Sequence, residues 1–230
     1  MLRSSATRAV ETAATALADE RMVVVLTDHA GQTKGTLVLA AERARPEAIN
    51  FMVTHGRGVV CVAMADARLA ALELPALPRT GPARLDSAFT VSVDLRVGTT
   101  SGVSAADRAL TARALADPAG VAADFARPGH VFPLRAAPGG VLERRGCVEA
   151  AVDLATLSAV QPAAVSCAIL ADDGSLAQLP DLRALAGRHR FPVVSVDDLV
   201  THRRRLDAHA ARRGATGFPR SSGAPLLARR

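Results

Sequence analysis

Short apolar runs with polar residues at both ends constrain the fold of this chain more than any other feature. Residues 22–27 read MVVVLT and residues 58–64 read GVVCVAM, and runs of this kind are typical of buried strands. Further strands are predicted over 37–42, 88–95, 164–170 and 192–196. Helices are predicted over 46–55, 66–74, 148–158 and 180–189. Another helix is predicted to follow a turn at 99–102 and to end near residue 116, and a last helix is predicted to begin at residue 196. Because strands and helices mix without a strict alternating rhythm, the pattern predicts an α+β fold with a mixed sheet.

Three other segments are predicted to lie outside the sheet. Residues 28–36, DHAGQTKGT, indicate a polar loop, and the segment 126–140, rich in Pro and Gly, indicates an irregular surface segment. The first 21 residues predict an amphipathic helix. Acidic residues interrupt them, so they lack the continuous apolar core of a signal peptide. No apolar run reaches membrane-spanning length, so we expect no membrane partner.

The core must be built from small side chains. Aromatic residues make up only 3% of the 230 residues, with no Trp or Tyr, so Ala, Val and Leu have to fill the interior. Each of them buries less area than an aromatic residue, and many are therefore needed. The three cysteines are an odd number without framework spacing, which predicts reduced thiols and a cytoplasmic location.

Charge divides the chain into two parts. Eight Arg and a single Asp follow residue 202 and account for the whole positive excess of a chain whose formal net charge is +6. We expect one folded domain over 1–205 and a basic, disordered tail over 206–230. The tail lacks interleaved aromatic residues, so nucleic acid is not an expected partner.

A series of motifs runs through the chain in order. They are PEAINFM at 46–52, THGRGVVC at 54–61, FTVSVD at 89–94, SGVSAADR at 101–108, RPGHVFPLR at 127–135, EAAVDL at 149–154 and DDG at 172–174. Together they resemble the 3,4-dihydroxy-2-butanone 4-phosphate synthase family, over about residues 21–205. The resemblance implies a three-layer α/β/α sandwich and a homodimer with active sites near the subunit interface. It also implies conversion of ribulose 5-phosphate to a four-carbon phosphate plus formate, with Mg²⁺.

Residues that hold the metal and move protons in that family are replaced in this chain. The family loop reads roughly DDEDRENEGD, whereas residues 27–36 read TDHAGQTKGT, with Gln32 at the metal-binding glutamate. The family motif GHTEA reads GCVEA, so Cys147 replaces a metal-binding histidine, and Ala168 stands at a catalytic glutamate. Mg²⁺ prefers oxygen ligands. We therefore expect that Mg²⁺ has been lost and that the chain uses no metal cofactor.

The remaining pocket residues supply the candidate site. The predicted substrate-binding residues are Arg144, Arg145, Thr100, Ser101, Ser104, Asp107, Gln32 and Asp28. The predicted catalytic residues, which are the groups left to act as nucleophile, acid or base, are Cys147, His130, Cys61 and Lys34. Paired arginines suit an anionic ligand, and their charge is expected to lower the pKa of the Cys147 thiol and to make it more reactive than Cys167. Cys147 fits equally well as a small buried side chain, and Lys34 as an exposed loop residue.

These replacements favour a repurposed enzyme. It would be a metal-independent lyase, isomerase or cyclase that acts on a small anionic or carbonyl-bearing substrate in specialised metabolism. Two alternatives stay open. One is the authentic synthase, and the other is a non-catalytic binding or pseudoenzyme subunit that pairs with an active relative. The expected partners are a small molecule and a second copy of the chain.

Overall fold

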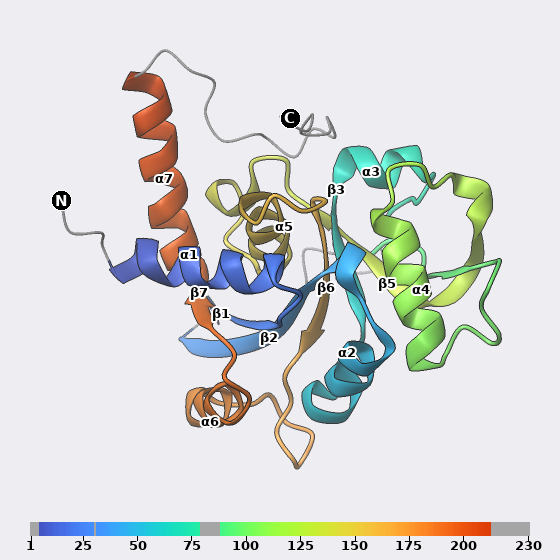
Figure 1. The fold of residues 1–230 in the computed structure, drawn as a ribbon, viewed down its shortest axis with the longest axis horizontal. Coiled ribbons are helices and arrows are strands. Elements are labelled where there is room, and N and C mark those ends of the chain that lie inside the picture. Colours follow the sequence, from blue (N-terminus) through green and yellow to red (C-terminus); the bar gives the residue numbers. More distant parts are fainter. Residues whose placement is uncertain (1–4, 30, 79–87, 213–230) are drawn as a thin grey trace.

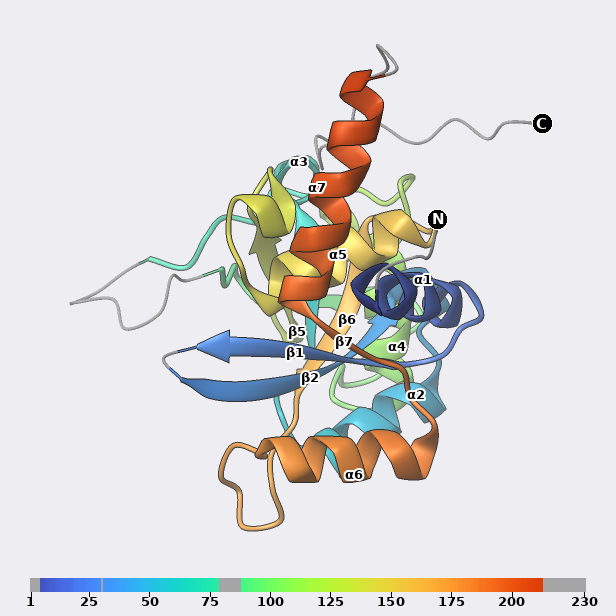
Figure 2. The ribbon, with the colours of Figure 1, turned by 90° about the vertical axis from the view of Figure 1, so that its left-hand side faces the viewer.

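The computed structural model describes residues 5–29, 31–78 and 88–212, in which helices cover both faces of one mixed sheet (Figures 1 and 2). The sheet has seven strands in the order β4-β5-β3-β6-β2-β1-β7. The strands are β1 (Val23–His29), β2 (Gln32–Ala40), β3 (Cys61–Ala65), β4 (Val93–Leu95), β5 (Phe125–Ala136), β6 (Ala163–Ala168) and β7 (Val193–Ser195). The helices are α1 (Ser5–Ala18), α2 (Pro46–Phe51), α3 (Asp66–Ala71), α4 (Ala105–Ala116), α5 (Cys147–Leu157), α6 (Leu179–His189) and α7 (Val196–Arg212). The α+β fold with a three-layer α/β/α arrangement is therefore confirmed.

The two faces of the sheet carry separate cores. Figure 2 shows α1, α5 and α7 above the strands and α2 and α6 below them. Because side chains alternate along a strand, Val38 joins the core under α1, α5 and α7, while its neighbours Leu37 and Leu39 join the opposite core. The core under α1, α5 and α7 consists entirely of Ala, Val and Leu, as the composition predicted, whereas the opposite core also contains Met, Ile and Phe.

The first two strands are longer than the sequence predicted. β1 continues to His29 and β2 begins at Gln32, so the segment 28–36, predicted as a loop, is mostly a β-hairpin in which His29 pairs with Gln32. A two-residue connection is the commonest hairpin loop, and Gly31 at its second position has φ of +76°. The polar composition misled the prediction, because backbone pairing between neighbouring strands does not require apolar side chains.

The segment 126–140 was also predicted wrongly as irregular. Most of it belongs to β5, a strand of 12 residues that pairs with both β3 and β4. Val131 and Leu134 are buried in it, and the carbonyl oxygen of Pro133 accepts hydrogen bonds from both the amide and the hydroxyl of Thr90. A proline is tolerated in a strand where its missing N–H is not needed, and this explains how β5 keeps its pairing.

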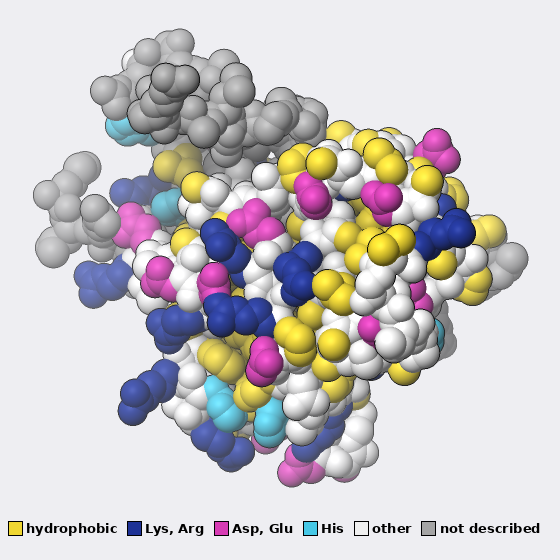
Figure 3. Space-filling view, turned by 45° about the vertical axis from the view of Figure 1, so that its right-hand side comes forward, with side chains coloured by type: hydrophobic (Ala, Val, Ile, Leu, Met, Phe, Trp, Pro, Cys, Tyr) yellow, Lys and Arg dark blue, Asp and Glu magenta, His cyan; other side chains and the backbone are white. Residues whose placement is uncertain are grey.

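The last helix is fixed at its start and along its buried side. Ser195 and Asp198 cap it reciprocally through side chain and backbone, and Arg203 pairs with Asp153 of α5 in the interior. α7 extends to Arg212, and the rest of the predicted tail, 213–230, lies outside the described residues. No helix in the described part of the chain is long and apolar enough to cross a membrane. Basic and acidic side chains are interspersed on the face drawn in Figure 3.

Candidate functional site

One group of predicted site residues lies where the β1–β2 hairpin meets the amino end of α5. We call it the hairpin region, and it consists of Gln32, Lys34, Thr36, Cys61 and Cys147. Gly146 precedes α5 with an extended backbone and no side-chain cap. Cys147 is the first helical residue, and its thiol lies in hydrogen-bonding contact with the hydroxyl of Thr36. The thiol of Cys61 interacts electrostatically with that of Cys147, so both predicted thiols belong to this region.

Strand alternation decides which hairpin side chains face α5. Gln32, Lys34 and Thr36 are spaced by two along β2 and share one face of the sheet with Val38. Asp28 pairs in register with Thr33, whose hydroxyl donates to its carboxylate at 2.6 Å. This pair belongs to the other face, so Asp28 is turned away from Cys147. Ala168 of β6 lies opposite Thr36.

The thiols of this region are not activated. Burial raises the pKa of Cys61 to about 12 and also raises the pKa of Cys147, against a smaller opposing effect of its hydrogen bond with Thr36. Burial likewise raises the pKa of Cys167 to about 11. The prediction that nearby arginines lower the pKa of Cys147 is therefore wrong: burial raises it, and no arginine is among the groups that shift it. The expectation that Cys147 reacts faster than Cys167 stays a prediction.

Both predicted arginines have acidic partners. Arg144 donates from Nε to the buried carboxylate of Glu149 at 2.8 Å, and it also donates to the carbonyl oxygen of Arg135. Arg145 pairs with Asp197 at the surface, where the two side chains are 59% and 71% exposed. An exposed pair of this kind contributes about 0–1 kcal/mol. Arg145 can therefore exchange its partner at low cost, whereas Arg144 is held within the protein.

A second group lies at the start of β5, next to β4. We call it the histidine region, and it consists of Asp94, Thr100, Gly102, Asp107 and His130. Asp94 receives two hydrogen bonds from His130, one from the backbone N–H at 2.9 Å and one from ring Nδ1 at 2.7 Å. The imidazole is about half exposed, whereas the side chain of Asp94 is only 13% exposed. One ring nitrogen of the histidine is therefore held by Asp94, while part of the ring is open to solvent.

The turn before α4 is organised by one buried carboxylate. Asp107 accepts from the backbone N–H and hydroxyl of Thr100 and from the N–H of Gly102. Ser104 caps α4 by accepting from the N–H of Asp107. These bonds, led by the one from the Thr100 hydroxyl, lower the pKa of Asp107. Asp107 and Ser104 therefore shape the turn, while Ser101 is exposed on it.

The two regions are widely separated at β2 but adjoin at β3. His130 is on β5 and Thr36 is on β2, with β3 and β6 between them. Three strand spacings of about 4.8 Å place them roughly 14 Å apart. Cys61 lies between these positions, because it pairs in register with Phe132 of β5, two residues beyond His130. Lys34 on β2 is therefore three strands from His130, whereas Cys61 is on the strand next to it.

The donors of the hairpin region do not form a magnesium site by themselves. Gln32, Thr36 and Cys147 offer an amide, a hydroxyl and a thiol, and the carboxylate that acts on Cys147, that of Glu149, is paired with Arg144. Throughout 5–29, 31–78 and 88–212, no three His, Cys, Asp or Glu side chains gather closely enough to hold a metal. Mg²⁺ is usually held by one or two carboxylates together with water and substrate oxygens. We therefore derive no catalytic step through a metal.

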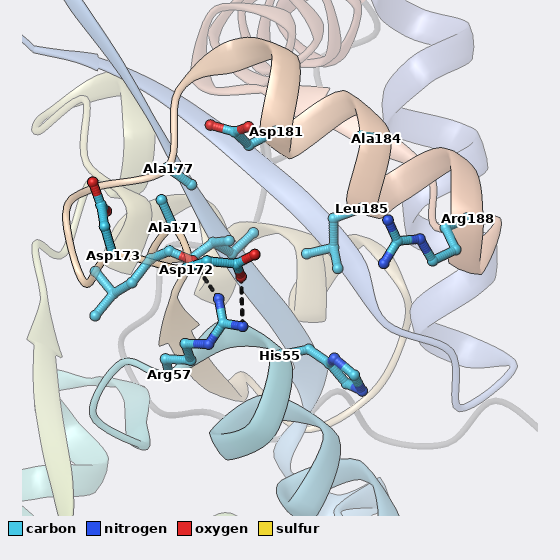
Figure 4. Close-up of a pocket in the computed structure, with 12 residues that line it drawn as sticks. His55, Arg57, Ala171, Asp172, Asp173, Ala177, Asp181, Ala184, Leu185 and Arg188 are labelled. Carbon is cyan, nitrogen blue, oxygen red and sulfur yellow. Dashed lines mark hydrogen bonds and ion pairs between the residues drawn. The ribbon is translucent and has the colours of Figure 1, made fainter.

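A pocket of about 410 Å³ opens on the other face of the sheet, between α6 and the loop that follows β6. Figure 4 shows Arg57 joined to Asp172 and to the carbonyl oxygen of Leu170, with His55 and Arg188 on the same side of the pocket. Acidic and basic side chains are mixed along its lining. The pocket contains none of the predicted site residues.

Sequence reasoning missed three residues that build the site. Thr36, Asp94 and Glu149 each make a contact that positions a predicted residue. Asp94 and Glu149 lie inside the motifs FTVSVD and EAAVDL, so a signal was present. Without coordinates, however, a buried acid in a strand or helix cannot be assigned to its partner.

Comparisons with known proteins agree on one family. A family model described as 3,4-dihydroxy-2-butanone 4-phosphate synthase matches residues 11–202. A 3,4-dihydroxy-2-butanone 4-phosphate synthase of Agrobacterium fabrum is 47% identical over 193 residues, which cover 84% of this chain and 91% of the relative. A crystal structure of 3,4-dihydroxy-2-butanone 4-phosphate synthase in complex with two magnesium ions superposes with a TM-score of 0.81 at 36% identity, over 85% of this chain and 96% of that one.

Several curated relatives are longer proteins. A probable bifunctional riboflavin biosynthesis protein of Oryza sativa is 45% identical over 201 residues, which cover 86% of this chain but 36% of the relative. The chain spans between 36% and 46% of the length of this protein and two similar riboflavin biosynthesis proteins.

These findings correct two expectations. The repurposed enzyme of specialised metabolism is overturned, because relatives at 43–48% identity carry the names of the synthase or of riboflavin biosynthesis proteins. The expectation that no metal cofactor is involved is overturned by the solved relative that holds two magnesium ions. Both errors arose because individual replaced residues were given more weight than the retained frame around them.

Proposed function

Because the chain belongs to the 3,4-dihydroxy-2-butanone 4-phosphate synthase family, we propose that it catalyses the reaction of that family. The substrate is ribulose 5-phosphate, and the products are 3,4-dihydroxy-2-butanone 4-phosphate and formate. The observation that carries the proposal is the 47% identity with the Agrobacterium synthase over 91% of its length. A relative that similar, and matched almost from end to end, supports the same reaction.

We place the phosphate of the substrate at the amino end of α5. The first N–H groups of a helix need acceptors, and Gly146 provides no side-chain cap there. Helix amino ends bind phosphate groups. Lys34 adds positive charge from the face of β2 that carries Thr36, and Arg145 can leave its exposed partner Asp197 to approach the anion. Arg144, held by Glu149, forms the inner wall of this phosphate site.

We assign acid–base work to His130. The reaction moves protons between carbon and oxygen atoms of the sugar phosphate, and a positioned side chain that accepts and returns a proton accelerates such steps by about 10²–10⁴-fold. His130 is half-exposed and has one ring nitrogen held by Asp94. The buried thiols are poor candidates, because burial raises the pKa of both Cys61 and Cys147.

A symmetric homodimer would unite the two regions. Within one chain, Lys34 and Thr36 of β2 lie three strands from His130, roughly 14 Å by strand spacing. Val97 and Val103, which flank the turn of the histidine region, are 82% and 49% exposed. Apolar side chains at such a position support contact with a second copy, in which the histidine region of one subunit faces the hairpin region of its partner. We also propose a cytoplasmic location, which the three free cysteines support.

Formate release tests the proposed reaction directly. The full chain is purified from a host that lacks its own synthase and is supplied with ribulose 5-phosphate and Mg²⁺, and formate is measured with a coupled dehydrogenase. We expect sustained formate production, together with rescue of riboflavin-free growth in the same host. A matched Cys167→Ala preparation controls for changes outside the site. If the wild-type chain produces no formate and rescues no growth, the proposal is rejected.

A further inference from the structure

We propose that Asp94 is the positioning residue for His130: it holds the ring with a proton on Nδ1, so that Nε2 is the atom that accepts and returns protons in the site. This inference rests on the proposed synthase function and identifies the residue that prepares its acid–base group. Asp94 itself is buried and bonded to His130, so its effect is exerted through the histidine.

The carboxylate holds the histidine at two points. Oδ1 accepts from the backbone N–H of His130 at 2.9 Å, and Oδ2 lies 2.7 Å from ring Nδ1. One bond fixes the main chain and the other fixes the ring, so the direction of Nε2 is determined by a single side chain. A lone contact to the ring would leave the imidazole free to swing on its own backbone.

The local strand pairing is interrupted at this place. Val93 pairs with Val131, but Asp94, the next residue of β4, pairs with Ala126, so residues 127–130 are extra on β5. Bulges of this kind redirect side chains and occur often beside active sites. Asp94 lies opposite the bulge, and its carboxylate reaches across to the last bulged residue. The bulge therefore brings His130 into position and the carboxylate fixes it there.

Two glycines make room for this arrangement. A Cβ on Gly102 would lie 2.0 Å from Asp94 Oδ2, and a Cβ on Gly129 would lie 2.1 Å from the backbone of Val93. Gly102 also has φ of +85°, and its N–H donates to Asp107. The turn that Asp107 organises therefore packs directly against the carboxylate of Asp94. A side chain at either glycine would separate the acid from the histidine.

Hydrogen-bond chemistry then sets the position of the ring proton. An ionised carboxylate only accepts hydrogen bonds, so ring Nδ1 must donate to Oδ2, and in the neutral ring Nε2 carries the free lone pair. When Nε2 takes a proton, the positive ring lies beside the carboxylate and is stabilised. An aspartate orients a histidine in the same manner in the catalytic triad of serine proteases, where replacing the acid by its amide leaves the wrong tautomer.

Asp94→Asn tests the proposal with an almost unchanged shape. The amide has one donor group in place of an acceptor, so it cannot accept from both the backbone N–H and ring Nδ1–H. If its oxygen keeps the backbone bond, its NH₂ faces Nδ1 and forces the ring proton onto Nε2. The chain is labelled with ¹⁵N-histidine, the signal of His130 is identified by its loss in His130→Gln, and the ring nitrogen shifts report the tautomer.

We expect the Nδ1–H tautomer in the wild-type protein and the Nε2–H tautomer in Asp94→Asn. We also expect kcat for formate release to fall by about 10²–10⁴-fold, with KM changed only a few-fold. Asp124→Asn is the matched control, because Asp124 also bonds a backbone N–H, that of Val121, but lies outside the site. Asp94→Asn added to His130→Gln should cost little more, since both act through one group.

The readouts separate this proposal from the synthase function. If the protein has no synthase activity but the tautomer of His130 still switches in Asp94→Asn, the positioning role of Asp94 is supported and only the proposed reaction is rejected. A wild-type ring with its proton on Nε2 would overturn the positioning, even if Asp94→Asn does not fold. Unchanged kcat in a folded Asp94→Asn would overturn it as well.

Discussion

The hairpin region and the histidine region both hold polar groups against the sheet, but in different ways. In the histidine region both carboxylates are held by N–H groups of nearby segments: Asp107 by the turn next to it, and Asp94 by the bulge opposite it. In the hairpin region the thiol of Cys147 contacts the hydroxyl of Thr36. On the neighbouring strand, opposite Lys34, the hydroxyl of Thr27 is buried without a partner.

The difference shows which parts of a site can change independently. A carboxylate that organises its own loop cannot be replaced without losing the loop, because the freed backbone N–H groups would be left unpaired. The hairpin backbone is held by strand pairing from Val23 to Val38, so its side chains can change while the fold remains.

Removing the histidine should cause the largest loss of activity. His130→Gln should lower kcat for formate release by about 10²–10⁴-fold, because a positioned acid–base group is lost. His189→Gln, in the aromatic cluster with Phe51 and Phe191, is the control and should leave kcat within about twofold. Steady-state kinetics of both variants provide the measurement. A fully active His130→Gln would remove the histidine region from the mechanism.

A carboxylate introduced into the hairpin region should raise the affinity of that region for Mg²⁺. Gln32→Glu places a negative oxygen ligand on the face that carries Thr36, and Mg²⁺ prefers such ligands. We expect Mg²⁺ affinity to rise at least about tenfold, corresponding to about 1.4 kcal/mol, as measured by calorimetric titration of both proteins. Gln32→Leu, which adds no charge at the same position, is the control. Equal affinity in wild type and Gln32→Glu would place the metal elsewhere.

Arg145 tests whether the phosphate binds at α5. A charge that approaches a phosphate in water is worth on the order of 1 kcal/mol at 4 Å, so Arg145→Ala should raise KM about fivefold and change kcat little. Arg188→Ala is the matched control, because Arg188 lines the pocket of Figure 4 on the other face of the sheet. If Arg188→Ala raises KM and Arg145→Ala does not, the substrate binds in that pocket instead.

The thiols should show the smallest effect on activity. Cys147→Ala should keep kcat within about threefold, and at pH 7.5 Cys61, Cys147 and Cys167 should all react with iodoacetamide more slowly than an unfolded cysteine, because burial raises each pKa. Rapid labelling of Cys147 in the folded protein, with loss of activity, would give the hairpin region a reactive nucleophile after all.

Alkaline unfolding checks the same thiols. The folded pKa of Cys61 is about 12, against an ordinary value of 9.0. The folded state therefore keeps its proton where the unfolded state loses it. The contribution of Cys61 to stability is complete below about pH 9 and is lost as the pH rises towards 12. Urea midpoints between pH 8 and 10.5 should fall less steeply in Cys61→Ala than in the wild-type chain.

Sequence patterns predicted most elements where apolar periodicity was strong. The runs at 22–27 and 58–64 lie on β1 and β3, and the amphipathic start of the chain forms α1. The patterns failed where pairing does not depend on apolar side chains: the polar hairpin around Gly31, and β5 with its Pro and Gly. Of the candidate site, family motifs located His130 and Cys147, but not the contacts made by Asp94, Thr36 or Glu149.

The sequence by itself determined the family, the small-residue core and the list of candidate groups, because these depend on residue identity and order. Only the tertiary structure decided how those groups act. Burial keeps the thiols protonated, Glu149 and Asp197 engage the two arginines, and the bulge at 127–130 aligns His130 with Asp94. Desolvation and hydrogen bonding depend on neighbours that are distant in the chain, and residue spacing alone does not contain them.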